Sequence, residues 1–328
     1  MSKAKLSDVA RIAGVSPMTV SRVLNGRGGA SPETVERIKQ IAADLQYQPN
    51  ALARGLKSDR SGIIGVIVPD ISNPFFPEII RGIESVAMQH SYNLLLCNVV
   101  ESADREVQLM RTLEGQRVDG LIWCSARLPD SDLVKSIQAF KATVLINRGA
   151  DPQIAGSIMI DYRAGATDAL RHLWSLGRRR IGIVAGPAKS QGATDRLNGL
   201  RAIFDELGAE AVATMHCTPD VNGGTEASRD LLEAHPNIDS LICYNDLNAV
   251  GALQTCETLG LRVPRDIGII GFDGIPLADL VRPKLSTLHV DKYAIGQLGM
   301  RMLIDRIGGK FVQHSIVIRP QLIARDST

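Results

Sequence analysis

The sequence has few of the residues that build disulfide frameworks, metal centres or membrane spans. Its five cysteines form no CxxC pair and no Cys/His cluster with zinc-ligand spacing, and most of them lie in apolar runs. No stretch approaches the ~18 apolar residues of a membrane helix, and the N-terminus lacks the apolar core of a signal peptide. We therefore expect buried reduced thiols, no metal, no membrane association and a cytoplasmic protein.

Catalytic motifs are also missing. The sequence contains no GxSxG elbow, no phosphate-binding GxxxxGKS or GxxxxGKT loop and no HExxH motif, and its six histidines are scattered. A sugar kinase or isomerase would need a nucleotide or metal constellation, which this sequence does not offer. We expect no catalytic residues and no cofactor.

Charge is distributed unevenly along the chain. Residues 1–60 carry ten Lys and Arg against five Asp and Glu, whereas the remaining residues carry 27 against 30. A basic head on a mildly acidic body is typical of proteins that bind nucleic acid through its phosphates, although the excess alone also suits an ordinary solvated surface. The length of 328 residues and the 45% hydrophobic content predict two or three domains with a substantial core.

The segment 8–25, DVARIAGVSPMTVSRVLN, predicts two short helices joined by a tight turn. The first helix is expected over 7–13, with Ser7 as its N-cap and Gly14 as its end. Its apolar face is expected to comprise Val9, Ala10 and Ile12.

A second helix start follows at Ser16, whose hydroxyl can cap free amides, and at Pro17, which fits a first helical position. Val20 and Val23 can face inward, which leaves the opposite side to meet the major groove. On that side Arg22 can bond guanine and Met18 can touch a thymine methyl. The DNA contacts expected in this region are Ser16, Pro17, Met18, Thr19, Ser21, Arg22, Asn25 and Ser31.

A third helix is predicted from Ser31, again with a proline at its first position. Its apolar stripe at helical spacing comprises Val35, Ile38, Ala42 and Leu45. A small helical bundle with a solvated basic face would explain the three helices equally well if their spacing stood alone.

Three motifs in combination identify a family. AGVS at 13–16, TVSRVLN at 19–25 and YQPNALARGLK at 47–57 resemble the LacI/GalR family of bacterial transcriptional repressors, and the resemblance continues to PQLIARDST at 320–328. It implies a repressor that binds a palindromic operator as a dimer under the control of a small-molecule effector. A solute-binding protein of a transporter would share part of this architecture, but the DNA-reading head and the missing export signal count against it.

The linker 48–60 contains a predicted helix over about 50–56. This helix is too short to be stable alone, since ~12 to 15 residues are usually needed, and Gly55 weakens it further. The resemblance implies that the linker folds against its dimer mate in the minor groove, with Leu56 wedged into a base step and Asn50 and Lys57 as further DNA contacts. A plain interdomain tether is the alternative.

From residue 61 onward, short apolar runs alternate with helical segments in two successive series. This pattern predicts parallel sheets flanked by helices, in two lobes or in one large α/β domain. The runs are GIIGVIVP, YNLLLCNV, GLIWCS, ATVLINR and SIMID, followed by RIGIVAG, AVATMHC, SLICYN and IGIIGFD. The resemblance implies the periplasmic-binding-protein type I fold with two doubly wound parallel-sheet lobes. The expected domains are an all-α helix-turn-helix headpiece over 1–47, a hinge over 48–60, and a two-lobed effector-binding and dimerisation domain over 61–328, with lobe 1 at about 61–160 and 291–319 and lobe 2 at about 161–290 and 320–328.

Polar groups follow the expected strand ends, where ligands of such sheets bind. Amide, carboxylate and guanidinium groups beside an aromatic face suit a hydroxyl-rich ligand, and we expect a sugar or sugar acid. The resemblance places the cleft contacts of sugar-binding members at Asn147, Asn245 and Asp273, and a recurrent cleft arginine at Arg196. The candidate effector contacts are Asn73, Phe75, Asn147, Arg148, Arg196, Asn245 and Asp273.

Some of these residues have structural alternatives. Asp273 could satisfy turn amides, Arg148 could form a salt bridge between lobes, and the neighbouring Asp246 could be a helix N-cap. Because the sequence reaches Thr328 without a leucine heptad extension, we expect a homodimer in preference to a tetramer. The sequence does not reveal the effector, its direction of action, the operator or the regulated genes.

Overall fold

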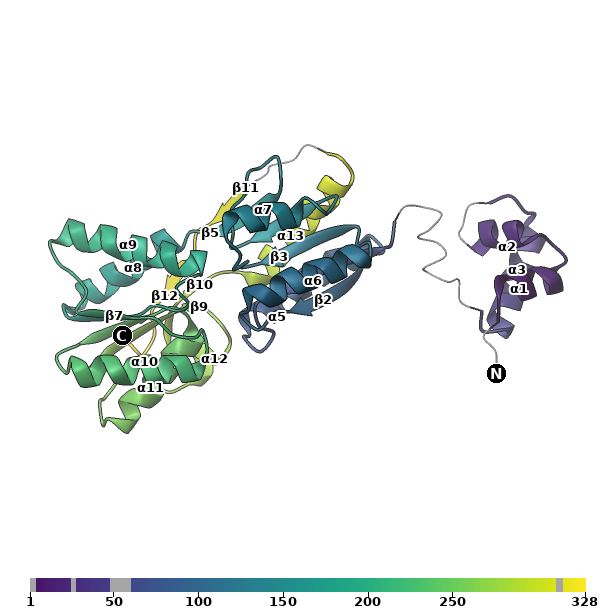
Figure 1. The fold of residues 1–328 in the computed structure, drawn as a ribbon. Helices are drawn as coiled ribbons and strands as arrows, with labels where there is room; N and C mark the ends of the chain where they lie inside the picture. The colour runs from purple at the N-terminus through teal and green to yellow at the C-terminus, as the bar shows by residue number, and fades with distance from the viewer. Residues whose placement is uncertain (1–3, 25–27, 48–59, 311–314) are drawn as a thin grey trace. The chain divides into compact units, whose positions relative to one another are not determined.

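The computed structural model describes residues 4–24, 28–47, 60–310 and 315–328, which form two compact units, 1–61 and 62–328. Figure 1 shows the helical first unit and the α/β second unit. The expected DNA contacts Asn25, Asn50, Leu56 and Lys57 lie outside the described residues. No helix in the described part of the chain combines the length and apolar character that crossing a membrane requires.

The first unit contains α1 (Leu6–Ala13), α2 (Pro17–Leu24) and α3 (Pro32–Asp44). As predicted, the Ser16 hydroxyl accepts the amide of Thr19 at 3.1 Å, and the Ser31 hydroxyl accepts the amide of Thr34 at 3.3 Å. These bonds satisfy amides that the first helical turn leaves unpaired. The core that joins the helices consists of Val9, Ala10, Ala13, Val20, Val23, Ile38 and Ala42.

Two predictions for α1 are wrong. Ser7 lies inside the helix, because Lys5 is its N-cap and donates its amide to the Asp8 carboxylate at 2.8 Å. Ile12 is 49% exposed, because Ala13 occupies the inward position next to Val9.

The second unit contains two six-stranded sheets, and the first is parallel throughout. Its strand order is β2-β1-β3-β4-β5-β11. The strands are β1 (Ile63–Val68), β2 (Asn93–Asn98), β3 (Gly120–Cys124), β4 (Thr143–Ile146), β5 (Gly156–Ile160) and β11 (Ser315–Ile318). One face is covered by α5 (Phe75–Gln89) and α13 (Lys292–Ile307), and the other by α6 (Ala103–Gly115) and α7 (Asp130–Ile137).

The second sheet repeats this order as β7-β6-β8-β9-β10, with β12 added antiparallel at the β10 edge. The strands are β6 (Ile181–Val184), β7 (Ala213–Met215), β8 (Ser240–Cys243), β9 (Gly268–Asp273), β10 (Ser286–His289) and β12 (Gln321–Ile323). Figure 1 shows its helices on the two faces. They are α8 (Tyr162–Ser175) and α9 (Gln191–Leu207) on one face, and α10 (Val221–Ala234) and α11 (Asp246–Thr258) on the other, with the short α12 (Leu277–Leu280) after β9.

The chain passes between the sheets three times, from β5 to α8, from β10 to α13 and from β11 to β12. We call the first sheet with its helices the first lobe and the second sheet with its helices the second lobe. One apolar core extends through both lobes. Helices α5 and α13 cross at Gly82 and Gly296, where a Cβ on either glycine would collide with a carbonyl oxygen of the other helix. This close crossing fixes α13 to the first lobe.

Candidate functional site

A pocket lies between the two lobes, at the carboxyl ends of their strands. Its empty volume is about 320 Å³, part of which is open to solvent. The first lobe contributes Asn73, Phe75, Phe76, Glu101, Ser125, Arg127 and Asn147, and the second contributes Tyr162, Arg196, Pro219, Tyr244, Asn245 and Asp273.

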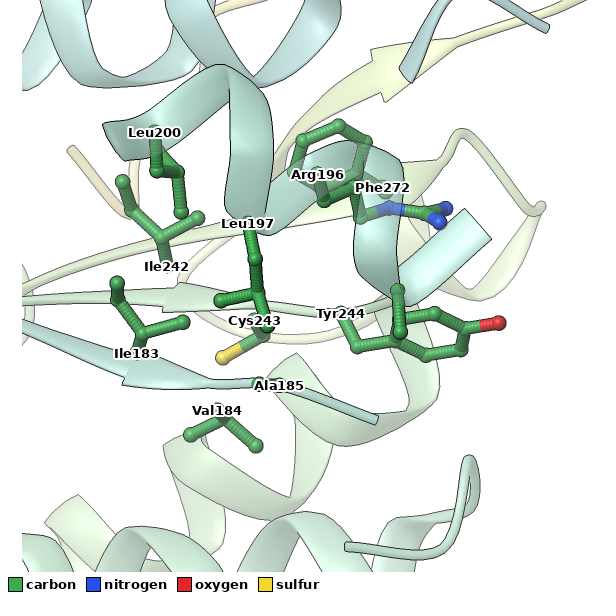
Figure 2. Close-up of a pocket in the computed structure, with 11 residues that line it drawn as sticks. Ile183, Val184, Ala185, Arg196, Leu197, Leu200, Ile242, Cys243, Tyr244 and Phe272 are labelled. Carbon is green, nitrogen blue, oxygen red and sulfur yellow. The ribbon is translucent and has the colours of Figure 1, made fainter. Parts of the chain in front are cut away.

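Arg196 projects from α9 into this pocket and is 5% exposed. Its guanidinium carbon lies 3.6 Å from the ring centre of Tyr162, 4.5 Å from that of Tyr244 and 4.7 Å from that of Phe272. Figure 2 shows Arg196 beside Phe272 and Tyr244, next to a cluster of aliphatic side chains that includes Leu200 and Ile242. The aromatic faces stabilise the buried cation and fix the orientation of its nitrogen atoms.

The charge partner of Arg196 is Asp273, but the pair is incomplete. Arg196 Nη2 lies 3.6 Å from Asp273 Oδ1, beyond hydrogen-bond distance, and Arg196 Nε is buried without a partner in the described protein. Burial raises the pKa of Asp273 to about 6, although the charges of Arg196 and Lys292 lower it. The second lobe therefore presents a cation and a carboxyl that are not fully satisfied by protein groups.

The first lobe carries a second arginine–carboxylate pair, which sequence reasoning missed. Arg127 Nε donates to Glu101 Oε2 at 2.8 Å, and Arg127 Nη1 donates to the Ser125 carbonyl oxygen at 2.9 Å. The buried carboxylate of Glu106 holds this loop, because it accepts the amides of Arg127 and Leu128. Burial raises the pKa of Glu106, and these hydrogen bonds oppose the rise.

The three expected asparagines all reach the pocket, but they differ in the bonds they already make. Asn73 Oδ1 accepts the Phe75 amide at 3.0 Å. Asn245 is the N-cap of α11, with its Oδ1 accepting the amide of Asn248 and its Nδ2 donating to the carbonyl of Pro219. Asn147 makes only a 3.5 Å contact from Nδ2 to Ser125, and its buried Oδ1 has no partner in the described residues. Asn147 is therefore the best placed of the three to accept a ligand hydroxyl.

Arg148 does not line the pocket, and its predicted effector contact stays a prediction. Its Nη2 donates to the Leu128 carbonyl at 3.0 Å and to Asp130 Oδ1 at 2.6 Å. Both partners belong to the first lobe, so the alternative of a salt bridge between lobes is wrong.

Asp246 is neither a cap nor a pocket residue. It is fully buried and accepts the Thr287 hydroxyl at 2.6 Å and the Ile275 amide at 2.8 Å. Burial first, and the charge of Asp273 second, raise the pKa of Asp246 to about 8.

Three of the seven pocket residues absent from the predicted set lie one or two residues after a strand. Ser125 comes after β3, Tyr244 after β8 and Tyr162 two residues after β5. Their position after a predicted strand was a usable signal, whereas their residue types were not distinctive. The residues missed were Phe76, Glu101, Ser125, Arg127, Tyr162, Pro219 and Tyr244.

The outer side of α2 matches the predicted reading surface in part. Pro17, Met18 and Arg22 are exposed, with Met18 at 64%, and the Arg22 guanidinium lies beside Gly29. Ser16 and Thr19 share a hydroxyl contact of 2.9 Å at the start of α2. These two residues and Ser31 stabilise helix starts, and their predicted DNA contacts stay predictions, as does that of the half-buried Ser21.

A helix-turn-helix unit followed by two α/β lobes with a pocket between them defines a ligand-responsive DNA-binding regulator. Residues 5–50 match the family described as bacterial regulatory proteins, lacI family, and residues 170–328 match the periplasmic binding protein-like domain. The chain is 36% identical to the ribose operon repressor of Halalkalibacterium halodurans over 326 residues, which cover 98% of this chain and 96% of that protein. It belongs to the LacI family of transcriptional regulators and is not an enzyme.

Two solved structures are similar over most of the chain. One is the Lac repressor dimer bound to operator and the anti-inducer ONPF, with a TM-score of 0.90 and 27% identity, covering 100% of this chain and 99% of that one. The other is a LacI family regulator from Enterococcus faecium with bound ribose, with a TM-score of 0.73 and 25% identity, covering 81% of this chain and 98% of that one.

Proposed function

We propose that this regulator is a cytoplasmic repressor that binds a palindromic operator as a dimer, and that a neutral sugar between its lobes changes its operator affinity. Support for the dimer comes from the similar Lac repressor structure, a dimer on its operator. Support for a sugar comes from the ribose operon repressor and from the ribose-bound regulator. A two-fold operator doubles the few base contacts that one short helix can make.

The pocket charges favour a neutral sugar over a sugar acid. Arg127 is paired with Glu101, and Arg196 faces Asp273, so each arginine in the pocket has an acidic partner. Arg148, the third arginine near these strand ends, lies outside the pocket and bonds Asp130. An anion would also be repelled by the two carboxylates. Hydroxyl groups can donate to a carboxylate and accept from an arginine, which suits this arrangement.

The observation that carries the proposal is that two pocket-lining residues each have a buried polar atom without a partner in the part of the chain that the structure describes. Asn147 Oδ1 is an acceptor from the first lobe, and Arg196 Nε is a donor from the second. Buried groups of this kind cost free energy until they are bonded. A hydroxyl-bearing ligand between the lobes would bond both and would draw the lobes together.

A thermal-shift screen tests the ligand class. The panel contains D-ribose and other neutral pentoses and hexoses, with their sugar acids and sugar phosphates at equal concentrations. We expect at least one neutral sugar to raise the melting temperature more than its acid or phosphate, and Asp273→Ala to abolish that shift. A larger shift with the anionic compounds would refute the charge argument, and an undiminished shift in Asp273→Ala would remove that residue from the site.

Operator binding is tested by fluorescence polarisation with promoter fragments from the source genome and a random duplex. Arg22→Ala is expected to weaken specific binding by ~1 to 3 kcal/mol and to relax discrimination at one base pair. Equal losses on specific and random duplex would contradict base reading. Addition of the sugar selected by the screen should change operator affinity and leave random binding unchanged.

The link between sugar and operator is proposed to pass through the linker 48–60. Lobe closure would alter the separation of the two linkers in the dimer, and with it the minor-groove contact of Leu56. Leu56→Ala should therefore weaken operator binding and reduce DNA bending in a circular-permutation gel assay. Unchanged affinity and bending would rule this route out.

A further inference from the structure

Lys292, the first residue of α13, is buried to 1% exposure on the segment that crosses from the second lobe to the first. Its ammonium donates to the carbonyl oxygens of Asp273 at 2.8 Å, Gly274 at 2.9 Å and Val290 at 3.3 Å. Lysine is almost never buried to this degree unless it is paired. We therefore expect the buried ammonium of Lys292 to have a specific role where the chain crosses between the lobes.

The carbonyls that Lys292 binds belong to an unusual turn at the end of β9. Asp273 has φ +104°, a left-handed conformation that is strained for a residue with a side chain, and Gly274 follows with φ +64°. Gly274 also packs against His289 so closely that a Cβ would collide with that residue. This turn directs the Asp273 carboxylate into the pocket toward Arg196, and Lys292 bonds both of its carbonyl groups.

The same ammonium is also linked to the first lobe. Glu78 Oε2, in the first turn of α5, lies 3.9 Å from Lys292 Nζ. That turn carries Phe75 and Phe76, which line the pocket from the first lobe. The close glycine crossing fixes α13 to α5. Lys292 therefore moves with the first lobe, while its ammonium bonds a turn of the second lobe.

We propose that Lys292 is a positioning residue: it holds the turn at Asp273 and Gly274 so that the Asp273 carboxylate faces the effector, and through Glu78 it joins this turn to the first lobe. The inference rests on the proposed function of the pocket as the effector site. Lys292 does not line the pocket. A sugar that bonds Asp273 would therefore act, through Lys292, on the segment where the lobes meet.

Hydrogen–deuterium exchange of the protein without ligand tests the positioning. The amide of Gly274 donates to the Thr287 hydroxyl at 3.2 Å, and that of Ile275 donates to Asp246 at 2.8 Å, so both report on the turn. Lys292→Met keeps the length of the side chain and removes the charge. We expect these two amides to exchange about tenfold faster in this variant, while β8, in the same sheet, stays protected. Unchanged exchange at the turn, or equal loosening of β8, would overturn the proposal.

Asp291→Asn is the matched control. Asp291 precedes Lys292 and caps α13 by accepting the Ala294 amide at 2.9 Å, without a contact to the turn. Its substitution should leave exchange at Gly274 and Ile275 as in the wild type. If Lys292→Met does not fold, Lys292→Arg, which keeps the charge but displaces it, is measured instead and should still accelerate exchange at the turn. An unaffected turn in that variant would count against positioning.

Isothermal titration with D-ribose as the probe supplies the functional readout. Lys292→Met should lower the affinity about tenfold and Asp291→Asn less than twofold. Glu78→Gln should keep the ribose affinity but reduce the change in operator affinity that ribose causes, and an undiminished change would refute the link to the first lobe. If D-ribose binds none of the proteins, ribose is not the effector, and the titration uses the neutral sugar that the thermal-shift panel selects; the exchange experiment decides independently whether Lys292 holds the turn.

Discussion

The two lobes share a strand order, and each places one arginine–acid pair at the pocket, but the pairs differ in how complete they are. In the first lobe, Arg127 and Glu101 meet at 2.8 Å, and the Glu101 side chain is 24% exposed. In the second, Arg196 and Asp273 are 3.6 Å apart, and both side chains are 7% exposed. The pair in the second lobe is the more buried of the two, and its charged atoms are also farther apart.

This difference indicates where binding energy is available. The pair in the first lobe has its hydrogen bonds already, so a ligand adds little to it. The pair in the second lobe contains a buried donor, Arg196 Nε, without a partner in the described protein, and such a group costs about 1–3 kcal/mol. A ligand that bonds it recovers this cost. We infer that the second lobe supplies most of the affinity and that the first lobe closes over the bound ligand.

The largest expected effect comes from Arg196→Met. The variant removes the donor and leaves Asp273 without its nearest cation, so the carboxyl stays protonated to higher pH and accepts ligand hydroxyls poorly. We expect sugar affinity to fall by about 100-fold or more, equivalent to about 2.7 kcal/mol. Isothermal titration with the best sugar of the thermal-shift panel measures it. A loss of sugar affinity below tenfold would contradict the inference that the second lobe supplies most of the binding energy.

Arg127→Met is the corresponding change in the first lobe, and its expected effect is smaller. Because Arg127 is already bonded to Glu101 and to the Ser125 carbonyl, we expect a loss of about tenfold or less in the same titration, near 1.4 kcal/mol. Glu101→Gln serves as its control, since it weakens the ion pair but keeps the arginine. A loss for Arg127→Met equal to that for Arg196→Met would show that the lobes contribute equally.

The fold was predictable to the extent that its strands are continuous apolar runs. The strands β1, β6 and β9 are buried on both faces by flanking helices, which makes them stand out in the sequence. In contrast, β10, β11 and β12 were missed. Strands β11 and β12 are short edge strands whose residues are exposed or half-buried, and β10 is a four-residue strand, STLH, in which three residues are polar. The pairing of β11 and β12 depends on partners far away in the sequence, β5 and β10.

The pocket was predictable where a polar or aromatic residue follows a strand, as at Asn73, or where the family resemblance named a position, as at Arg196. Asn147 and Arg148 are adjacent and follow the same strand, yet one enters the pocket and the other bonds Asp130 on its own lobe. Asn147 has φ +59°, which turns the chain between the two side chains, and residue type does not reveal such a turn. Arg127 was missed for a related reason, since its loop is positioned by the distant carboxylate of Glu106.

Asp246→Asn tests the difference between the lobes through the pH dependence of stability. With a folded pKa of about 8, against an ordinary 3.8, the carboxyl of Asp246 binds a proton in the folded protein that the unfolded chain has lost. Its contribution to stability is fully present below pH 3.8 and declines as the pH rises to about 8. Asparagine does not titrate, so the melting temperature of the variant relative to the wild type should increase by about 3 °C between pH 6 and 9.

Differential scanning calorimetry in buffers of equal ionic strength gives the measurement. Asp130→Asn, which alters a 90% exposed carboxylate in the first lobe, is the control and should show no such trend. A difference for Asp246→Asn that is flat with pH would mean that this carboxyl is ionised across the range. The second lobe would then hold one buried carboxyl fewer with a raised pKa, and the contrast with the well-bonded pair of the first lobe would lose one of its supports.

The smallest effect on binding is expected from Arg148→Met, the first-lobe cation that lies outside the pocket. The change removes hydrogen bonds to the Leu128 carbonyl and to Asp130, which should destabilise the lobe by about 1–2 kcal/mol. Sugar affinity should stay within about twofold, since no pocket group is altered. Titration and calorimetry on one sample separate the two quantities. A loss of affinity comparable to that of Arg196→Met would mean that Arg148 enters the pocket when the lobes close, and the first lobe would then supply a cation to the ligand in addition to the Asn147 acceptor.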